Sequence, residues 1–179
     1  MQIRETSIAG LVELIPRVFN DERGMFFESY NEQIFKKLGL PTNFVQDNQS
    51  FSIKGVVRGL HFQKAPFAQG KLVRVISGKV LDVAVDIRPE SPTFGKYEIF
   101  ELSSEKNNIA YIPEGFAHGF AALEDSIFSY KCTNIYSKES EAGILWNDET
   151  LGIDWGVADP IVSEKDAILP TFKSFFGNI

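Results

Sequence analysis

The strongest constraint on the fold is the regular alternation of short apolar runs with turns that contain Gly or Pro along most of the chain. Such runs, about four to eight residues long, indicate antiparallel strands, whereas a parallel α/β fold needs long helical segments between its strands. The expected strands cover residues 43–47, 55–62, 71–77, 79–86, 97–102, 109–112, 119–123 and 127–133. This pattern predicts an all-β fold, a sandwich or barrel of the jelly-roll type with a few short helices.

One helix is expected over residues 31–38. Ile34, Phe35 and Leu38 share one face of this segment, and Gly39 follows it directly. A glycine in that position commonly ends a helix, so the sequence predicts that the helix stops there.

Ser77 and Gly78 separate two valine-rich runs and occupy the position of a tight turn. The sequence therefore predicts that residues 71–77 and 79–86 pair as a β-hairpin. Residues 163–179 are expected to form a short helical or irregular tail laid over the barrel.

Composition limits the function classes. A chain of 179 residues with 44% hydrophobic residues predicts one domain spanning residues 1–179. The formal net charge of -6 argues against a general nucleic-acid binder. Cys132 is the single cysteine, which excludes an internal disulfide and fits a reducing compartment. We find no signal peptide and no apolar stretch long enough to span a bilayer, so we expect a cytoplasmic protein without membrane contact.

The two histidines of the chain are the first candidates for chemistry. His61 lies on a strand-like segment three residues after Arg58, and Lys71 begins the next strand-like run. Histidine is the side chain whose ordinary pKa best suits proton transfer near neutral pH. The segment therefore predicts a site built around His61.

His118 follows a Pro-Glu-Gly-Phe-Ala turn whose spacing resembles the second motif of cupin barrels. Metal-binding cupins carry an earlier His-x-His pair, but here Gln63 stands two residues after His61. Because a catalytic metal normally needs about three protein ligands, we expect no metal.

The motifs of the chain, taken in order, resemble those of the dTDP-4-dehydrorhamnose 3,5-epimerase family of cupin-fold enzymes over nearly the whole sequence. The matching segments are residues 21–24 with Phe26 and Glu28, then 46–48, 58–61, 69–75, 82–88, 91–95, 112–120, 130–133 with Tyr136, and 163–166.

The resemblance implies an isomerase of dTDP-L-rhamnose synthesis that inverts C3 and C5 of dTDP-4-dehydro-6-deoxy-D-glucose without a cofactor. It assigns the general base to His61, its carboxylate partner to Asp166 and the general acid to Tyr130. Lys71 would stabilise the enolate formed at the C4 ketone. This chemistry needs two proton-transfer groups on opposite faces of the sugar, which these residue types can supply.

The resemblance also implies a substrate site and a homodimer in which neighbouring subunits share residues around the early Arg and Glu. Arginines would bind the diphosphate, amide side chains could hydrogen-bond to the edge of the thymine base, and aromatic rings could stack on that base. The implied substrate-binding residues are Arg23, Phe26, Glu28, Gln46, Asp47, Asn48, Arg58, Lys71, His118, Tyr136 and Glu141.

The residues taken alone leave other interpretations open. Tyr130 could pack in a barrel, Asp166 could be an exposed charge in a tail, and Lys71 could be a solvated strand-edge residue. At the level of function, the alternatives are an epimerase or ketoisomerase that acts at one carbon of a related dTDP-deoxysugar, a sugar-nucleotide-binding cupin without turnover, and a metal-dependent cupin oxygenase.

Overall fold

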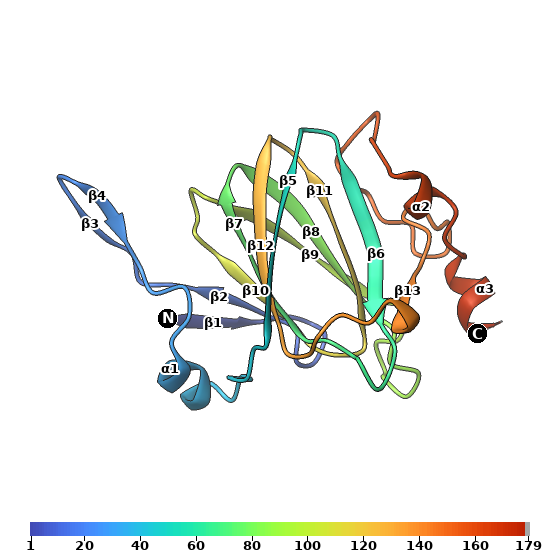
Figure 1. The fold of residues 1–179 in the computed structure, drawn as a ribbon, viewed down its shortest axis with the longest axis horizontal. Coiled ribbons are helices and arrows are strands. Elements are labelled where there is room, and N and C mark those ends of the chain that lie inside the picture. The colour runs from blue at the N-terminus through green and yellow to red at the C-terminus, as the bar shows by residue number, and fades with distance from the viewer. Residues whose placement is uncertain (178–179) are drawn as a thin grey trace.

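The computed structural model describes residues 1–177 and shows two packed antiparallel sheets (Figure 1). The first sheet has six strands in the order β1-β2-β10-β7-β12-β5. Their bounds are β1 Gln2–Glu5, β2 Val12–Ile15, β10 Ile109–Ile112, β7 Lys71–Ser77, β12 Ser126–Cys132 and β5 Gln46–Ser52.

The second sheet has five strands in the order β13-β6-β11-β8-β9. Their bounds are β13 Glu141–Gly143, β6 Val57–Gln63, β11 Phe116–Ala122, β8 Lys79–Asp86 and β9 Tyr97–Ser103. The expected all-β class is therefore confirmed, and most expected strands lie within a few residues of their observed positions.

Alternate side chains fill the space between the two sheets. Val73 and Val75 of β7 and Val80 and Ala84 of β8 belong to one buried cluster there. This two-residue period is what strands with one face on a core require. The same period sends Lys71, two residues before Val73, toward the interior.

The predicted hairpin between residues 71–77 and 79–86 is wrong. β7 pairs with β10 and β12, whereas β8 pairs with β11 and β9, so the chain crosses from one sheet to the other at Gly78. Gly78 has a φ of 85°, and an added Cβ would stand 2.3 Å from the carbonyl oxygen of Asp125. The turn residue was identified correctly, but alternation within each strand does not say which strand it pairs with.

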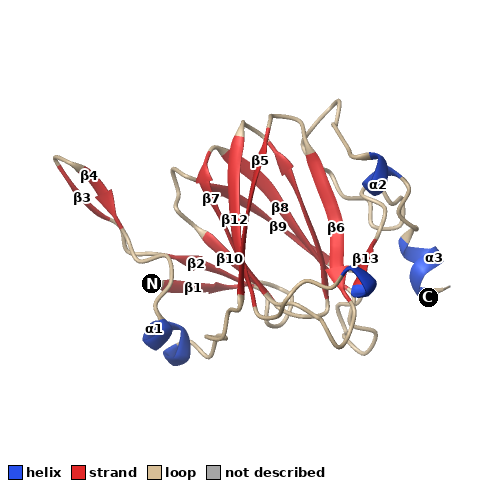
Figure 2. Cartoon of the chain, in the orientation of Figure 1, coloured by secondary structure: helices blue, strands red, loops and turns tan. Residues whose placement is uncertain are grey.

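The short helices cover the outer faces of the sheets (Figure 2). Helix α1, Glu32–Lys37, is capped by Asn31 and packs Phe35 on the first sheet, which confirms the helix expected over residues 31–38. In the C-terminal segment, α2 (Glu164–Ala167) and α3 (Phe172–Phe176) lie beside the second sheet, which confirms the expected tail as far as residue 177. The 3-10 helix η1, Lys138–Ser140, precedes β13.

A third, two-stranded sheet forms an arm that projects away from the packed sheets (Figure 1). Its strands are β3, Phe19–Asp21, and β4, Gly24–Phe26. Phe19, Met25 and Phe26 are 49%, 55% and 66% exposed. The arm thus carries apolar side chains that this chain alone does not bury.

Several short strands were not predicted from the sequence. β1 to β4 and β13 have three or four residues each, too few for a clear alternating pattern. β5 was expected at 43–47, but it runs from Gln46 to Ser52 because its polar residues on the inner face obscure the pattern. Within residues 1–177 we find no helix long and apolar enough to cross a membrane.

Candidate active site

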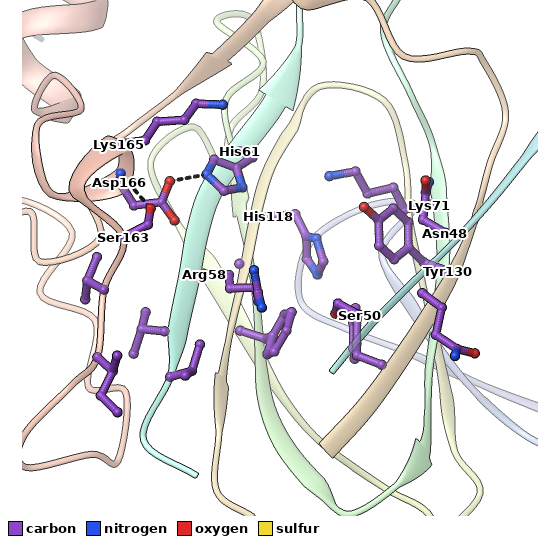
Figure 3. Close-up of a pocket in the computed structure, with 18 residues that line it drawn as sticks. Asn48, Ser50, Arg58, His61, Lys71, His118, Tyr130, Ser163, Lys165 and Asp166 are labelled. Carbon is purple, nitrogen blue, oxygen red and sulfur yellow. Dashed lines mark hydrogen bonds and ion pairs between the residues drawn. The ribbon is translucent and has the colours of Figure 1, made fainter. Parts of the chain in front are cut away.

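A cavity of about 610 Å³ opens between the two sheets and is closed on one side by the segment that leads into α2 (Figure 3). Both sheets and this segment contribute polar side chains to its wall. They are Asn48, Gln49, Ser50, Arg58, His61, Lys71, His118, Tyr130, Ser163, Lys165 and Asp166.

A β-bulge in β6 brings Arg58 and His61 to the same side of their strand. His118 of β11 stands opposite His61 and Phe120 opposite Arg58, so two steps along β11 match three along β6. Such an extra residue re-aims the side chains that follow it. Gly59 occupies the bulge with a φ of 130°, and an added Cβ would meet the Cα of Gly119 at 2.6 Å, so both positions require glycine.

His61 and Asp166 form the central contact of the cavity. The Nε2 of His61 lies 2.6 Å from Oδ1 of Asp166 (Figure 3). Ser163 caps α2 by accepting a hydrogen bond from the Asp166 amide, and Oδ2 of Asp166 accepts one from the Gly59 amide. Burial alone would raise the pKa of Asp166, but its hydrogen bond to His61 and the nearby charges hold that pKa below the usual value. An ionised Asp166 orients the imidazole through Nε2 and leaves Nδ1 toward the cavity.

Tyr130 and Lys71 lie on the other side of the cavity, with His118 between them and His61 (Figure 3). Tyr130 shares the inner face of β12 with Phe128, and burial raises the pKa of its hydroxyl group, which therefore remains a proton donor near neutral pH. The Nζ of Lys71 lies 5.9 Å from the centre of the Tyr130 ring, and burial lowers its pKa.

His118 has its own carboxylate partner. Its Nε2 lies 2.8 Å from Oδ1 of Asp82 on β8, and both residues are buried. Burial lowers the pKa of His118, although the Asp82 charge acts in the opposite direction. His118 in the cavity wall and its partner Asp82 thus form a second His-Asp pair in addition to His61 and Asp166.

A smaller hollow of about 260 Å³ adjoins the cavity, and Asn48, His61, Lys71 and Tyr130 line both. It holds three more of the residues implied as substrate-binding, which are Gln46, Tyr136 and Glu141. Glu141 accepts hydrogen bonds from the Tyr136 hydroxyl at 3.0 Å and from Lys165 at 2.6 Å. These contacts connect the hollow with α2.

Four of the implied substrate residues lie outside these two hollows. Asp47 points to the opposite face of β5 and pairs with Lys131 at 2.9 Å. Arg23 and Phe26 are on the arm, where Arg23 pairs with Asp21, and Glu28 follows the arm and accepts a hydrogen bond from Asn31. One chain does not bring these residues to His61.

Five polar residues around the site were not predicted from the sequence, namely Gln49, Ser50, Asp82, Ser163 and Lys165. Asp82 lies within the otherwise apolar run 80–85 of β8, and an acidic residue in such a run is the signal that could have revealed it. Ser163 and Lys165 both precede Asp166 within three residues, but only the fold brings that segment to β6. Across residues 1–177, no group of three or more His, Cys, Asp or Glu side chains is arranged to hold a metal ion.

The arrangement suits acid-base chemistry at carbon. An imidazole oriented by a carboxylate faces a protonated phenol across the cavity, and a lysine lies beside the phenol. The His61-Asp166 pair can remove a proton from one face of a bound molecule, and the Tyr130 phenol can supply a proton to the other face. The Lys71 ammonium group can stabilise negative charge on an oxygen atom.

Comparison with known proteins agrees with this chemistry. A family model described as dTDP-4-dehydrorhamnose 3,5-epimerase matches residues 5–174. An enzyme of that name from Salmonella typhimurium is 55% identical over 173 residues, which cover 95% of this chain and 94% of the relative. The solved structure of the Elizabethkingia anophelis enzyme is 51% identical, covers 97% of each chain and gives a TM-score of 0.92.

A second solved structure carries a ligand. It is a dTDP-6-deoxy-D-glucose-3,5-epimerase from Legionella pneumophila in complex with dTDP-4-keto-L-rhamnose. It is 46% identical, covers 95% of this chain and 92% of its own, and gives a TM-score of 0.91. The cupin-type fold and the epimerase class expected from the motifs are thus confirmed, and this chain belongs to the dTDP-4-dehydrorhamnose 3,5-epimerase family.

Proposed function

We propose that this enzyme inverts C3 and C5 of dTDP-4-dehydro-6-deoxy-D-glucose to give dTDP-4-dehydro-L-rhamnose. The observation that carries the proposal is the placement of the His61-Asp166 pair and Tyr130 on opposite sides of one cavity. The similarity to the Legionella enzyme that binds dTDP-4-keto-L-rhamnose supports the choice of substrate.

In the first step, Nδ1 of His61 removes the proton from the carbon beside the C4 ketone. The electron pair of the C-H bond moves into the ring and gives an enolate with its charge on O4. Asp166 accepts the Nε2 hydrogen bond at 2.6 Å and stabilises the imidazolium that forms. The Lys71 ammonium group stabilises the enolate oxygen, and the loss of one such donor costs roughly 3 kcal/mol of barrier.

In the second step, the Tyr130 hydroxyl group donates its proton to the opposite face of the same carbon. The enolate collapses to the ketone with inverted configuration. Proton exchange with solvent then resets His61 and Tyr130, and the sequence repeats at the second carbon. Each step is a proton transfer with no oxidation or reduction, and the Lys71 ammonium group supplies the positive charge that the enolate oxygen needs.

The nucleotide would lie toward the smaller hollow, where Gln46, Asn48 and Tyr136 offer amides and a ring. Arg58 lines the cavity and is our candidate for one diphosphate contact. Its Nε donates to Ser52 at 3.0 Å, which holds the guanidinium group in place.

We further propose a homodimer in which the arm of one chain completes the site of the other. The exposed apolar side chains Phe19, Met25 and Phe26 support this proposal, since a lone arm would leave them in water. Arg23 and Glu28 would then reach the partner's nucleotide. Mixing an Arg23→Ala variant with a His61→Ala variant tests it, because hybrid dimers would contain one intact site and regain activity that neither parent has.

We propose a cytoplasmic location, which the free and buried Cys132 supports because a reducing compartment preserves such a thiol. The family resemblance to a biosynthetic enzyme that uses a nucleotide sugar supports it as well.

The decisive experiment is an incubation with dTDP-4-dehydro-6-deoxy-D-glucose in deuterated water, followed by location of the label. We expect deuterium at both C3 and C5. Label at one carbon alone would select an epimerase that acts at a single centre, and tight binding without any exchange would indicate a non-catalytic binder.

A further inference from the structure

Asp82 is a buried carboxylate that the proposed mechanism does not use. Its side chain is fully enclosed on the inner face of β8. Oδ1 accepts a hydrogen bond from His118, whereas Oδ2 has no hydrogen-bond partner within the described part of the chain. Burying a charged carboxylate with one oxygen unpaired is costly, so a compensating interaction is needed.

Lys71 is a buried basic group on the other side of the same interior. Its side chain lies inside the cavity, and no carboxylate comes within ion-pair distance of Nζ among residues 1–177. An enolate needs this group as an ammonium ion, but burial favours the neutral amine. The site therefore requires a source of negative charge that keeps Lys71 protonated without occupying it.

We infer that Asp82, held by His118, is a positioning residue whose charge keeps Lys71 protonated for the enolate. This inference rests on the proposed function of Lys71. Lys71 of β7 lines the same cavity as His118, and His118 is hydrogen-bonded to Asp82 of β8 in the opposite sheet. The negative charge of Asp82 favours the charged form of Lys71. Because His118 accounts for one oxygen of Asp82, the carboxylate is fixed in place and Lys71 stays free to meet the substrate oxygen.

Other charged or titratable groups also face Lys71. They are Tyr130 and Cys132 of β12, His118 of β11, His61 and Arg58 of β6, Lys64 after β6, Glu141 of β13, Lys165 and Asp166 of α2 and Arg88 beyond β8. Both oxygens of Asp166 already accept hydrogen bonds, from His61 and from the Gly59 amide. Glu141 is already paired with Lys165, and Cys132 is an uncharged thiol at neutral pH because burial raises its pKa. Asp82 is the buried carboxylate in this set that has an oxygen left over.

The first test follows the titration of Lys71 by the 13C shift of its Cε, assigned by its absence in Lys71→Met. In Asp82→Asn the amide oxygen can still accept the His118 hydrogen bond, so mainly the charge is removed. We expect the Lys71 midpoint to fall by about one pH unit. The alkaline limb of the kcat profile should move to lower pH by the same amount. The control Glu124→Gln removes an exposed carboxylate in the turn between β11 and β12 and should leave the midpoint unchanged.

A reciprocal measurement keeps the inference testable if Asp82→Asn does not fold. Coupling between two sites is mutual, so Lys71→Met should raise the titration midpoint of the Asp82 carboxyl carbon by a similar amount. An unchanged Lys71 midpoint in folded Asp82→Asn, or an unchanged Asp82 midpoint in Lys71→Met, overturns the inference. Both titrations use the enzyme without substrate, so their results do not depend on the outcome of the deuterium experiment that tests the proposed reaction.

Discussion

Gly59 and Gly119 lie against each other on neighbouring strands, and a Cβ added to Gly119 would stand 2.6 Å from the carbonyl oxygen of Arg58. This close approach allows the bulge that points both Arg58 and His61 into the cavity. The position of the proposed base therefore depends on two residues that have no side chain.

We accordingly predict that Gly119→Ala lowers both stability and turnover. The methyl group must displace backbone, which costs roughly 1–3 kcal/mol in a packed interior. Thermal unfolding and initial rates measure the two effects. Gly152→Ala is the control, since its Cβ would meet nothing closer than 3.9 Å and only the φ of 58° is strained. If Gly119→Ala keeps normal turnover, the close approach is not needed for the site.

We predict that His61→Ala lowers turnover more than Asp166→Ala does. His61 removes the substrate proton, whereas Asp166 orients the imidazole ring and stabilises the imidazolium ion. Loss of a general base costs about 100- to 10,000-fold in rate. The measurement is the initial rate of epimerisation in correctly folded variants. Asp154→Ala, which removes an exposed carboxylate of the C-terminal segment, is the matched control. Near wild-type turnover in His61→Ala would eliminate His61 as the base.

We predict that Tyr130→Phe separates proton removal from inversion. This variant keeps the ring and should bind substrate, but it lacks the donor on the face opposite His61. Deuterium should still enter the first carbon, returned by the imidazolium to the face it left, so that configuration is retained. The readout is exchange and product configuration in one sample. The control is Tyr97→Phe, which removes a hydroxyl group that contacts Gly152 outside the cavity. Unimpaired inversion in Tyr130→Phe would contradict the assignment.

We predict a pH-dependent loss of stability in Asp86→Asn. Burial would raise the pKa of Asp86, but hydrogen bonds from Arg88, Ser91 and Thr93 outweigh it and hold that pKa far below the usual value. A carboxylate with a depressed pKa stabilises the fold above its unfolded pKa, near 4, and loses this contribution as pH falls toward the folded value.

The wild type should therefore exceed Asp86→Asn by roughly 3 kcal/mol at pH 7, and the difference should shrink below about pH 4. Denaturant unfolding across this pH range measures it. Glu90→Gln, an exposed charge near the same turn, should show no such dependence. A difference that stays constant down to pH 2 would show that the charge of Asp86 is not what stabilises this turn.

We predict that chelator treatment leaves turnover unchanged. In the proposed reaction the positively charged Lys71 stabilises the enolate in place of a metal ion, and Gln63 stands two residues after His61 where metal-binding cupins have a second histidine. The test compares rates before and after extended dialysis against a chelator. Activity that disappears and then returns with one added divalent metal would refute the prediction.

The fold class follows from the amino-acid sequence alone, because alternation of apolar residues is a local property that each strand carries in its own residues. The sequence also determined the helix at Glu32–Lys37, whose cap and apolar face are local too. The order of motifs identified the family and, through it, the residue types of the site.

Which of these segments lie next to one another depends on long-range contacts in the folded protein. The sequence predicted a hairpin at Gly78, but the two strands joined there belong to different sheets, since a strand's pattern does not encode its partner. Likewise Arg58 and His61 are an odd number of residues apart and should face opposite sides, yet the bulge at Gly59 brings both inward. Asp166 reaches His61 across 105 residues of chain because α2 packs on the edge of β6, a contact between distant segments that no local pattern contains.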